Sequence, residues 1–365
     1  MGRIMTPEIE LEPTETKIEI EPIESEADDL YVDTASYKIA NYPADFTLEV
    51  LYQKIKNKEI ILPDFQRSYV WTKKKAGRLI ESFLLGLPVP QIFLYKVPES
   101  ESLLVIDGHQ RLKTICLFFD GIWKDNSKFT LLGVKTTWEG KTFVDLEPNE
   151  QRRFKNYVLR SILFEQTDPK DNRSIFEIFE RLNTGGMPLV QQEIRNCMVR
   201  GNIIKFLKEL NAHKSWRELL DSDEPDDRLM DIEFILRFFA LYKNWKNYKR
   251  PMKDFITDYM EENKNLSREE MHKLKDLFIK TTDLILKRIG KKAFIGKRGV
   301  HVSMLDSMMV AIATLIDKIP EKEDLRPRWK RLVSNKAYEG RIAKSTTDTD
   351  RVQERIKLAL QHFGK

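Results

Sequence analysis

The sequence predicts an α+β protein in which a mixed domain of strands and helices is followed by a helical domain. Up to about residue 188, short runs rich in Val, Ile, Leu and Phe alternate with segments of helical period. Beyond that point the segments of clear periodicity are helical. A chain of 365 residues is long enough for two domains. We therefore expect an acidic tail over 1–29, an α/β domain over 30–195 and an all-helical domain over 196–365.

In the α/β domain, periodicity and helix-stopping residues define the first elements. Residues 47–57 have helical period and lead into a strand that ends at Pro63. A second helix runs through "KKKAGRLIESFLL", whose apolar residues share one face, and Gly86 ends it. Two strands follow, "QIFLYKV" and "SLLVI", and residues 98–102 form the turn between them.

The later part of this domain contains four further predicted elements. Residues 129–146 are expected to form a β-hairpin that turns at Glu139 and Gly140. A helix over 148–157, the strand "LRSILFEQ" and an amphipathic helix over 171–183 come next, and "TGG" stops that last helix.

Composition and charge narrow the class of protein. Hydrophobic residues make up 41% and charged residues 33% of the chain, a globular profile. No apolar run approaches the roughly 18 to 20 residues that cross a bilayer, and no signal peptide is recognisable at the N-terminus. The two cysteines, Cys116 and Cys197, are too few for a disulfide framework or a thiolate zinc site, and we expect small core residues. The cytoplasm is the expected compartment.

The net charge of +5 conceals an acidic N-terminal segment. Residues 1–29 carry ten acids against Arg3 and Lys17, a net charge of −8, which leaves +13 for the rest of the chain. Dense like charge and prolines predict an extended, disordered segment. A basic body suggests a polyanionic partner, and the tail either competes for the same basic surface or serves only solubility.

The stretch "LLVIDGHQRLKTI" places a buried strand, a glycine turn and a helix in direct succession. The first N–H groups of a helix lack internal partners and favour an anion, and Gly108 lets backbone approach a ligand closely. Arg111 and Lys113 could bind phosphate oxygens, Asp107 could hold a divalent metal or position water, and Gln110 could orient that water. The alternative is structural, with Asp107 as an N-cap and Arg111 as its salt-bridge partner.

Two other segments end in similar polar clusters. "LPDFQRSYVW" follows a strand with Asp64, Gln66 and Arg67, and "FERLNTGG" ends a helix at Arg181 and Asn183. We expect the three corners 64–67, 107–111 and 181–183 to converge on one phosphoryl group.

Four segments in order resemble a known family: "ILPDFQRSYVW", "LLGLPVPQIFLYK", "LLVIDGHQRLKTI" and "IFEIFERLNTGGMPLVQQEIRNCM". They look like the hallmark segments of the GmrSD-type N-terminal domain, also called domain of unknown function 262 (DUF262). The similarity extends from about residue 45 to 200. It implies a ParB/sulfiredoxin-like α/β core that acts in prokaryotic restriction of foreign DNA and in antiviral defence.

In that family an Asp-Gly-Gln-Gln-Arg motif is linked to hydrolysis of GTP and related triphosphates and to control of DNA cleavage. The resemblance makes Asp107, Gln110 and Arg111 the catalytic candidates, with Mg²⁺ or another divalent cation held by Asp107. The third motif position departs from Gln to His, which puts the nucleotide preference in doubt. The nucleotide- or phosphate-binding candidates are Gln66, Arg67, Gly108, His109, Lys113, Thr114, Arg181 and Asn183.

Many relatives also carry a C-terminal nuclease domain built on a histidine-containing metal motif. Apart from His109, the histidines here are His213, His272, His301 and His362, and none has a recognisable motif around it, with His213 the nearest candidate. Either a partner chain supplies the nuclease or this chain acts alone.

Three basic segments are candidate DNA-binding surfaces. In "YKNWKNYKRPMK" the rings of Tyr242, Trp245 and Tyr248 either stack on bases or pack into the core. "GKKAFIGKRG" is a glycine-punctuated loop that is expected to be mobile, and "WTKKKAGR" is expected near the phosphate site. The DNA-binding candidates are Lys73, Lys74, Lys75, Arg78, Lys246, Lys249, Arg250, Lys291, Lys292, Lys297 and Arg298.

Two functions remain open from sequence. One is a hydrolase, a nucleoside triphosphatase with DNA-nicking (endonuclease) activity. The other is a non-catalytic sensor subunit that binds DNA or nucleotide and controls a nuclease on another chain. DNA and nucleotide are the expected partners, with no membrane, and the helical half could also serve homo-oligomerisation.

Overall fold

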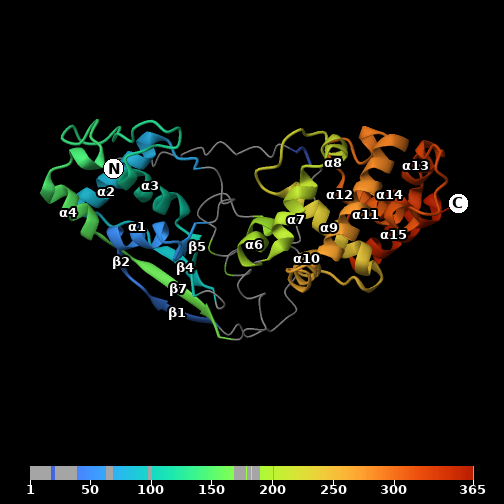
Figure 1. The fold of residues 1–365 in the computed structure, drawn as a ribbon, viewed down its shortest axis with the longest axis horizontal. Helices are drawn as coiled ribbons and strands as arrows, with labels where there is room; N and C mark the ends of the chain where they lie inside the picture. The colour runs from blue at the N-terminus through green and yellow to red at the C-terminus, as the bar shows by residue number, and fades with distance from the viewer. Residues whose placement is uncertain are drawn as a thin grey trace, which may run out of the picture. The chain divides into compact units, whose positions relative to one another are not determined.

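The computed structural model describes residues 18–20, 39–62, 69–97, 101–167, 178, 182, 190–199 and 201–364. The chain divides into two units (Figure 1). One unit is Tyr31–Cys197, and the other joins Met198–Lys365 to the N-terminal stretch Met1–Leu30. Each unit is described by itself below.

The first unit is built on a five-stranded mixed sheet in the order β1-β7-β4-β5-β3. β5 lies parallel to β3 and antiparallel to β4, while β7 is parallel to β4 and antiparallel to β1. A separate pair joins β2 to β6. The strands are β1 (Ile39–Pro43), β2 (Phe46–Thr47), β3 (Ile60–Ile61), β4 (Ile92–Lys96), β5 (Leu103–Asp107), β6 (Val158–Leu159) and β7 (Ser161–Gln166).

Helices gather on one face of this sheet (Figure 1). They are α1 (Leu48–Lys56), α2 (Lys73–Leu85), α3 (His109–Asp120) and α4 (Pro148–Asn156). The hydroxyls of Thr47 and Thr72 cap α1 and α2 by accepting from backbone N–H groups, and Gly86 ends α2 at φ 70°. Phe83, Phe118 and Phe154 pack edge to face between α2, α3 and α4. Mixed strands and helices in this unit confirm the α+β class.

The hairpin expected over 129–146 is wrong. The segment forms turns and a short 3-10 helix, η2 (Phe143–Asp145), instead of paired strands. The Glu139 carboxylate accepts from the N–H groups of Gly133 and Val134, and Glu81 accepts from that of Lys135. These carboxylates satisfy the amides that a strand ladder would have used.

One further difference concerns the edge of the sheet. No strand is predicted from the sequence at Ile39–Pro43, but β1 forms an edge strand against β7. The amphipathic helix expected over 171–183 lies almost wholly outside the described residues.

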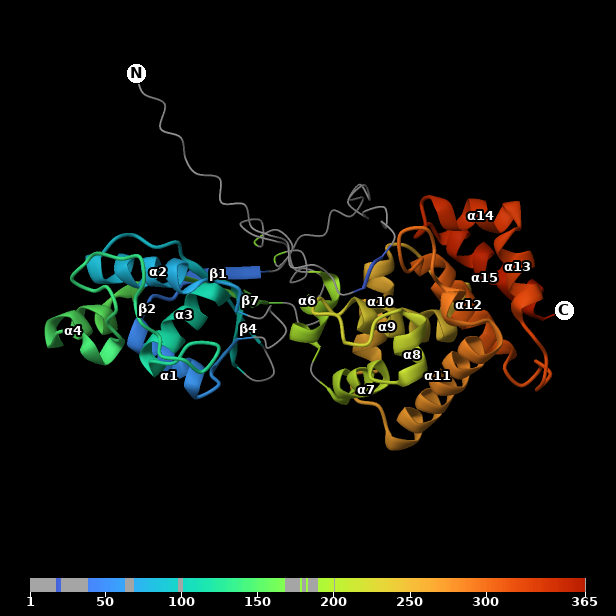
Figure 2. The same cartoon turned by 90° about the horizontal axis from the view of Figure 1, so that it is seen from above.

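The second unit is helical in its described residues, as expected (Figure 2). Its central helix α12 packs against α9, α11 and α15, and its side chains from Val302 to Ala313 are buried. None of the described helices is long and apolar enough to cross a membrane. The helices are α7 (Asn202–Asn211), α8 (Lys214–Leu219), α9 (Met230–Asn244), η4 (Trp245–Asn247), α10 (Met252–Glu262), α11 (Arg268–Arg288), η5 (Lys291–Ala293), α12 (Val302–Leu315), α13 (Arg326–Val333), α14 (Lys336–Ala343) and α15 (Thr349–Phe363), while α6 (Gln191–Met198) lies at the boundary of the two units.

Three residues of the acidic tail differ from the expectation of disorder. Ile18 is 1% exposed, and Ile20 forms a parallel bridge to Val300 in the helical unit. The physical reason is local alternation, since "IEI" offers an apolar face and an acidic face to a strand partner. The rest of the 1–29 tail lies outside the described residues.

Candidate functional site

The candidate site begins where β5 passes into α3. β5 ends at Asp107, Gly108 has φ 101°, and α3 starts at His109. A Cβ on Gly108 would lie 2.4 Å from Cγ2 of Ile92 at the start of β4. Positive φ and this close approach both require glycine, which fixes the direction in which α3 leaves the sheet.

Arg111 holds this corner together. Its Nη2 donates to Oδ2 of Asp107 at 2.6 Å, one helical turn earlier. Its Nη1 donates to the carbonyl oxygens of Pro90 and, at 3.0 Å, of Gln91, in the loop before β4. The side chain is 13% exposed, and burial lowers the pKa of its guanidinium although Asp107 opposes that shift. Arg111 thus joins three chain segments.

The structural alternative for this corner is half correct. Arg111 is the salt-bridge partner of Asp107, as that alternative expects. The N-cap of α3, however, is Gly108, which has no side chain to accept from the helix. The Asp107 side chain is 37% exposed, so its carboxylate is held by Arg111 and still reaches solvent.

Gln110 and Thr114 connect α3 to the segment before α2. Oε1 of Gln110 accepts from the backbone N–H of Val70 at 3.2 Å. Oγ1 of Thr114 donates to the carbonyl of Gln110 and lies 2.7 Å from the hydroxyl of Tyr69. Thr114 is fully buried in these contacts, so its assignment to phosphate binding is corrected to a structural role.

The parallel pairing of β3 and β5 determines which corners share an edge of the sheet. Ile60 pairs with Leu103 and Ile61 with Leu104, so β3 runs toward the edge at which Asp107 lies. Gln66 and Arg67 lie outside the described residues, but Tyr69 and Val70, which follow them, are bound to α3. This geometry favours the predicted approach of 64–67 to 107–111.

Strand direction does not bring the third corner, 181–183, to the same edge of the sheet. β7 runs opposite to β5, because it is parallel to β4, and therefore ends at the other edge. Arg181 and Asn183 lie outside the described residues, so their convergence on Asp107 stays a prediction. His109 and Lys113 lie on α3 and are both half-buried.

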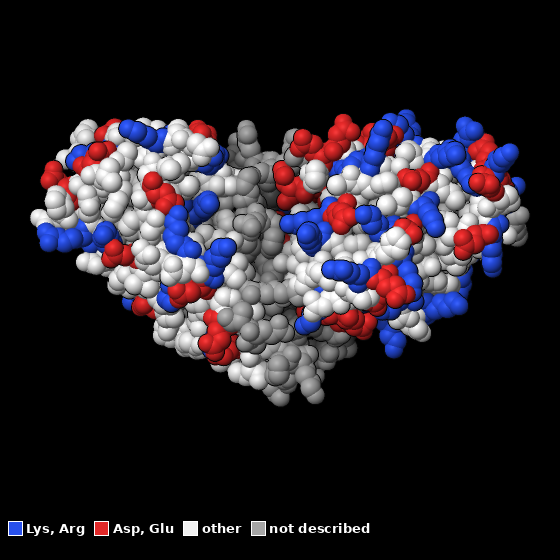
Figure 3. Space-filling view, viewed as in Figure 1, with Lys and Arg blue, Asp and Glu red and all other residues white. Residues whose placement is uncertain are grey.

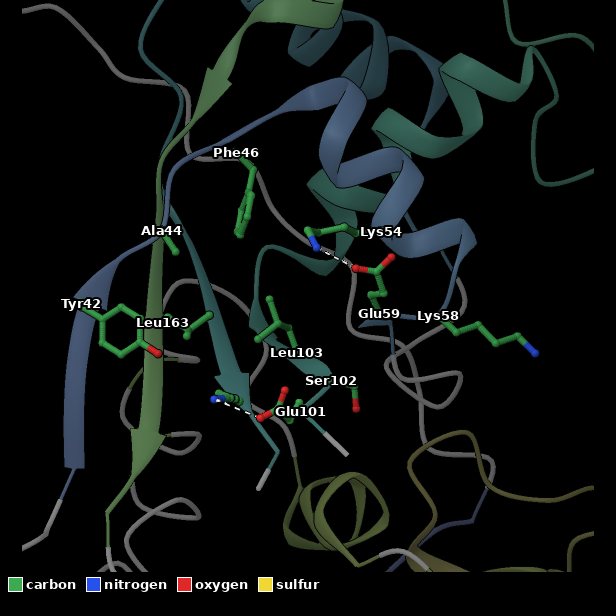
Figure 4. A pocket seen from close by; sticks show the side chains of 11 residues that line it. Tyr42, Ala44, Phe46, Lys54, Lys58, Glu59, Glu101, Ser102, Leu103 and Leu163 are labelled. Atoms are coloured by element: carbon green, nitrogen blue, oxygen red, sulfur yellow. Dashed lines mark hydrogen bonds and ion pairs between the residues drawn. The ribbon is translucent and has the colours of Figure 1, made fainter. Parts of the chain in front are cut away.

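A hollow in the first unit, drawn in Figure 4, is lined by none of the residues of this corner. Its volume is about 570 Å³, and its lining includes Ser102 and Leu103 at the start of β5. Asp107 stands at the other end of that strand, roughly 13 Å away at the usual rise per residue. Two of its lysines face carboxylates: Lys54 pairs with Glu59 at 2.7 Å, and Lys96 with Glu101 at 3.8 Å.

The aromatic residues of 242–253 pack into the core of the helical unit. Trp245 and Tyr248 are 8% and 0% exposed, Tyr242 is half-buried, and the hydroxyl of Tyr248 donates to the carbonyl of Thr347. Base stacking by the two buried rings is therefore excluded, and the core alternative holds. Lys246, Lys249 and Arg250 are exposed, and Arg250 pairs with Asp348 at 2.7 Å.

The other two basic segments differ in their surroundings. Lys73 on α2 donates to Ser127 and to the carbonyl of Lys128, beyond the C-terminal end of α3, so its predicted proximity to Asp107 gains no support. In the 290–299 loop, Ala293 and Phe294 are buried anchors while the four basic side chains are exposed. Basic and acidic side chains are interspersed on the visible face of both units (Figure 3). The basic side chains of these segments that are half-buried or exposed are Lys73, Lys74, Lys75, Arg78, Lys291, Lys292, Lys297 and Arg298.

The described part of the chain was compared with the side-chain clusters that usually bind metal ions. There, no three His, Cys, Asp or Glu side chains gather where they could hold a metal ion. His213, the nearest nuclease candidate, pairs with Asp283 at 2.8 Å instead.

A family model matches residues 48–200 of the chain. It describes the GmrSD restriction endonuclease, N-terminal domain. Residues 48–200 belong to this family. The matched segment contains β3 to β5, the Asp107 corner and α3, so the corner lies inside the GmrSD-type domain. The family supports a restriction-type, DNA-defence role for the chain. Among curated proteins, no sequence matches it.

The structure adds site residues that the sequence analysis did not single out. The carbonyl groups of Pro90 and Gln91 orient Arg111, and Tyr69 and Val70 tie the first motif to α3. The available signal was their position inside two of the four motif segments, "LPVPQ" and "FQRSYVW".

Proposed function

We propose that the Asp107 corner of this restriction-type protein binds and hydrolyses a nucleoside triphosphate. The observation that carries the proposal is the solvent-reaching carboxylate of Asp107, held at 2.6 Å by Arg111 at the N-terminal end of α3. The family description supports the DNA-defence context. The triphosphatase and nicking activities go beyond that description and are proposed here.

The chemistry follows from the groups at the corner. The first N–H groups of an α-helix have no partner within the helix and stabilise phosphate oxygens. Gln110 keeps its amide nitrogen for a water molecule, because its oxygen is occupied by Val70. Arg111 is the positioning residue, since its Nη atoms bind Asp107 and the loop at 90–91.

A Mg²⁺ ion fits this donor set in one way. Mg²⁺ is usually held by one or two carboxylates together with substrate phosphates and water, so a single carboxylate is enough. Oδ1 of Asp107 would be its protein ligand, since Oδ2 faces Arg111. When bound, the ion would neutralise charge on the phosphate oxygens.

The proposal is tested by phosphate release from GTP, ATP and CTP with Mg²⁺ or EDTA, alongside a plasmid-nicking assay. We expect the wild-type chain to hydrolyse at least one triphosphate in a Mg²⁺-dependent manner, and Asp107→Ala to lose that activity while staying folded, as its circular dichroism spectrum would show. Full turnover by a folded Asp107→Ala protein would contradict the assignment.

A sensor subunit is the second candidate function. The observation that favours it is the engagement of Arg111, whose buried guanidinium offers little free charge to a transition state. Such a protein would bind nucleotide or DNA and control a nuclease on another chain. Salt-dependent DNA binding with no hydrolysis of any triphosphate under any metal would select this function over the first.

A further inference from the structure

Residues 18–20, the Ile-Glu-Ile strand below, form one isolated β-bridge and one backbone hydrogen bond with Val300, at the end of the basic loop of the helical unit. Within the loop, Ile295 bridges Val300, and the N–H of His301 donates to the carbonyl of Phe294 at 2.8 Å. On the other side of Val300, Ile20 forms a parallel bridge, and the N–H of Val300 donates to the carbonyl of Glu19 at 2.7 Å. The short dark-blue stretch beside α8 in Figure 1 is this segment.

Ile18 anchors the Ile-Glu-Ile strand from the opposite side. Its side chain is 1% exposed, and its backbone N–H donates to the buried carboxylate of Asp226. Glu19, between the two isoleucines, is exposed. The alternation therefore directs an apolar side chain into the helical unit and an acidic one toward solvent.

Gly299 is shaped to this contact. A Cβ at Gly299 would lie 2.1 Å from the carbonyl oxygen of Glu19, with φ at 117°. Gly290 has a closely similar φ of 112°, and a Cβ there would meet nothing within 4 Å. The two glycines border the same loop. Substituting each in turn therefore distinguishes the effect of backbone strain from the effect of contact with the tail.

The charges on the two sides are opposite. The anchored residues belong to a segment of 29 residues with a net charge of −8. Their partner Val300 directly follows Lys297, Arg298 and Gly299, and both basic side chains are exposed. Acidic chain tethered next to a basic loop has a high effective concentration at that loop.

We propose that the Val300 edge is a docking site for the acidic Ile-Glu-Ile strand, and that the docked segment competes with DNA for the basic loop at 291–298. This inference rests on the proposed DNA-binding role. Release of the strand frees the loop cations for phosphate contacts, which increases both the affinity and its salt dependence. If docking of the strand is favourable by about 1.4 kcal/mol, the apparent affinity for DNA is about tenfold lower than that of the undocked chain.

The test compares the wild-type chain with Gly299→Ala and its strain control Gly290→Ala. Ile18→Ser, with Ile18→Val as its conservative control, releases the strand without altering the loop. Amide hydrogen exchange at Val300 reports docking, and fluorescence anisotropy of a labelled duplex at two salt concentrations reports affinity. We expect Gly299→Ala and Ile18→Ser to accelerate exchange and to bind DNA about tenfold more tightly, whereas the two controls behave as wild type.

In a background that carries Lys297→Ala and Arg298→Ala, release of the strand should no longer increase the affinity for DNA. This result would identify the basic loop as the surface that binds DNA. Faster Val300 exchange with unchanged DNA affinity overturns the competition, and equal exchange in wild type and Ile18→Ser overturns the docking. If no variant binds DNA, the DNA-binding part of the proposed function fails and the competition fails with it. If DNA binding is lost with the loop cations but is indifferent to strand release, only this inference fails.

Discussion

At the scale of single residues, Arg111 and Asp107 make a short, partly buried connection between three segments. The guanidinium binds the end of β5 through Asp107 and the loop before β4 through the carbonyls of Pro90 and Gln91. A planar fork with fixed donors is needed to reach a carboxylate and two carbonyls together, and a lysine ammonium is not equivalent. These contacts therefore explain why residue 111 is an arginine.

Arg111→Lys should lower kcat by about 100-fold, because the Asp107 carboxylate loses its fixed position. The variant should also lose about 0.5–1.5 kcal/mol of unfolding free energy, since the carbonyls of the exposed residues Pro90 and Gln91 lose their guanidinium donor. Arg153→Lys is the matched control, because Arg153 donates to the carbonyl of Leu84 elsewhere in the same unit. Steady-state kinetics and urea unfolding measure both effects, and an unchanged kcat in Arg111→Lys would remove the positioning role.

A second residue-scale contrast lies in the helical unit. Asp306 receives Arg237 at 2.6 Å and Arg355 at 3.2 Å, with all three side chains buried. Asp306→Asn removes the carboxylate charge that these two buried guanidinium groups share and should cost about 3–5 kcal/mol. Asp348→Asn breaks the exposed pair with Arg250, of nearly equal length at 2.7 Å, and should cost about 0–1 kcal/mol. Equal losses in urea unfolding would contradict this distinction.

At the scale of elements, α3 presents its buried face to the sheet and α2. Cys116 on that face is 6% exposed, and burial raises the pKa of its thiol from 9.0 to about 12. The sequence-based prediction of a small core residue is confirmed for Cys116, while the side chain of Cys197 lies outside the described residues.

In a Cys197→Ser background, Cys116 should resist iodoacetamide at pH 8 in the native state and react once the chain is unfolded. Because the folded pKa is the higher one, the unfolded chain loses the thiol proton first as pH rises. Stability therefore falls between pH 9 and about 12, and Cys116→Ser should reduce that slope. Rapid alkylation of the native protein would show that α3 does not bury this face.

The sequence predicted elements best where local signals and packing agree. The strands β4 and β5 are largely apolar runs, and α2 has an apolar face, a Thr cap and a Gly stop. These local signals agree with the packing, so the sequence located all three elements. The 129–146 segment failed because Glu139 and Glu81 satisfy its amides from side chains, which alternation does not reveal. β1 was missed because its pairing with β7 is long-range and its sequence ends in Pro43.

At the scale of the whole molecule, the sequence predicted the order of the two units and the residues of the main corner. It offered the Asp107–Arg111 pair only as an alternative, and it did not predict the other contacts of these residues. Thr114 and Arg111 carry polar groups that suit phosphate equally well, and only the fold shows them engaged with Tyr69 and the 90–91 loop. The acidic tail was read from its net charge, whereas the alternation at Ile18–Ile20 decides where it binds.

The central claim is that the Asp107 carboxylate takes part in hydrolysis of a nucleoside triphosphate. The most direct measurement is kcat for the preferred triphosphate in Asp107→Asn and in Glu165→Gln, whose carboxylate is 38% exposed and also salt-bridged, to Lys96 on the neighbouring strand. We predict that Asp107→Asn lowers kcat by about 100-fold or more and that Glu165→Gln stays within about twofold of wild type. Wild-type turnover in a folded Asp107→Asn protein would contradict the account.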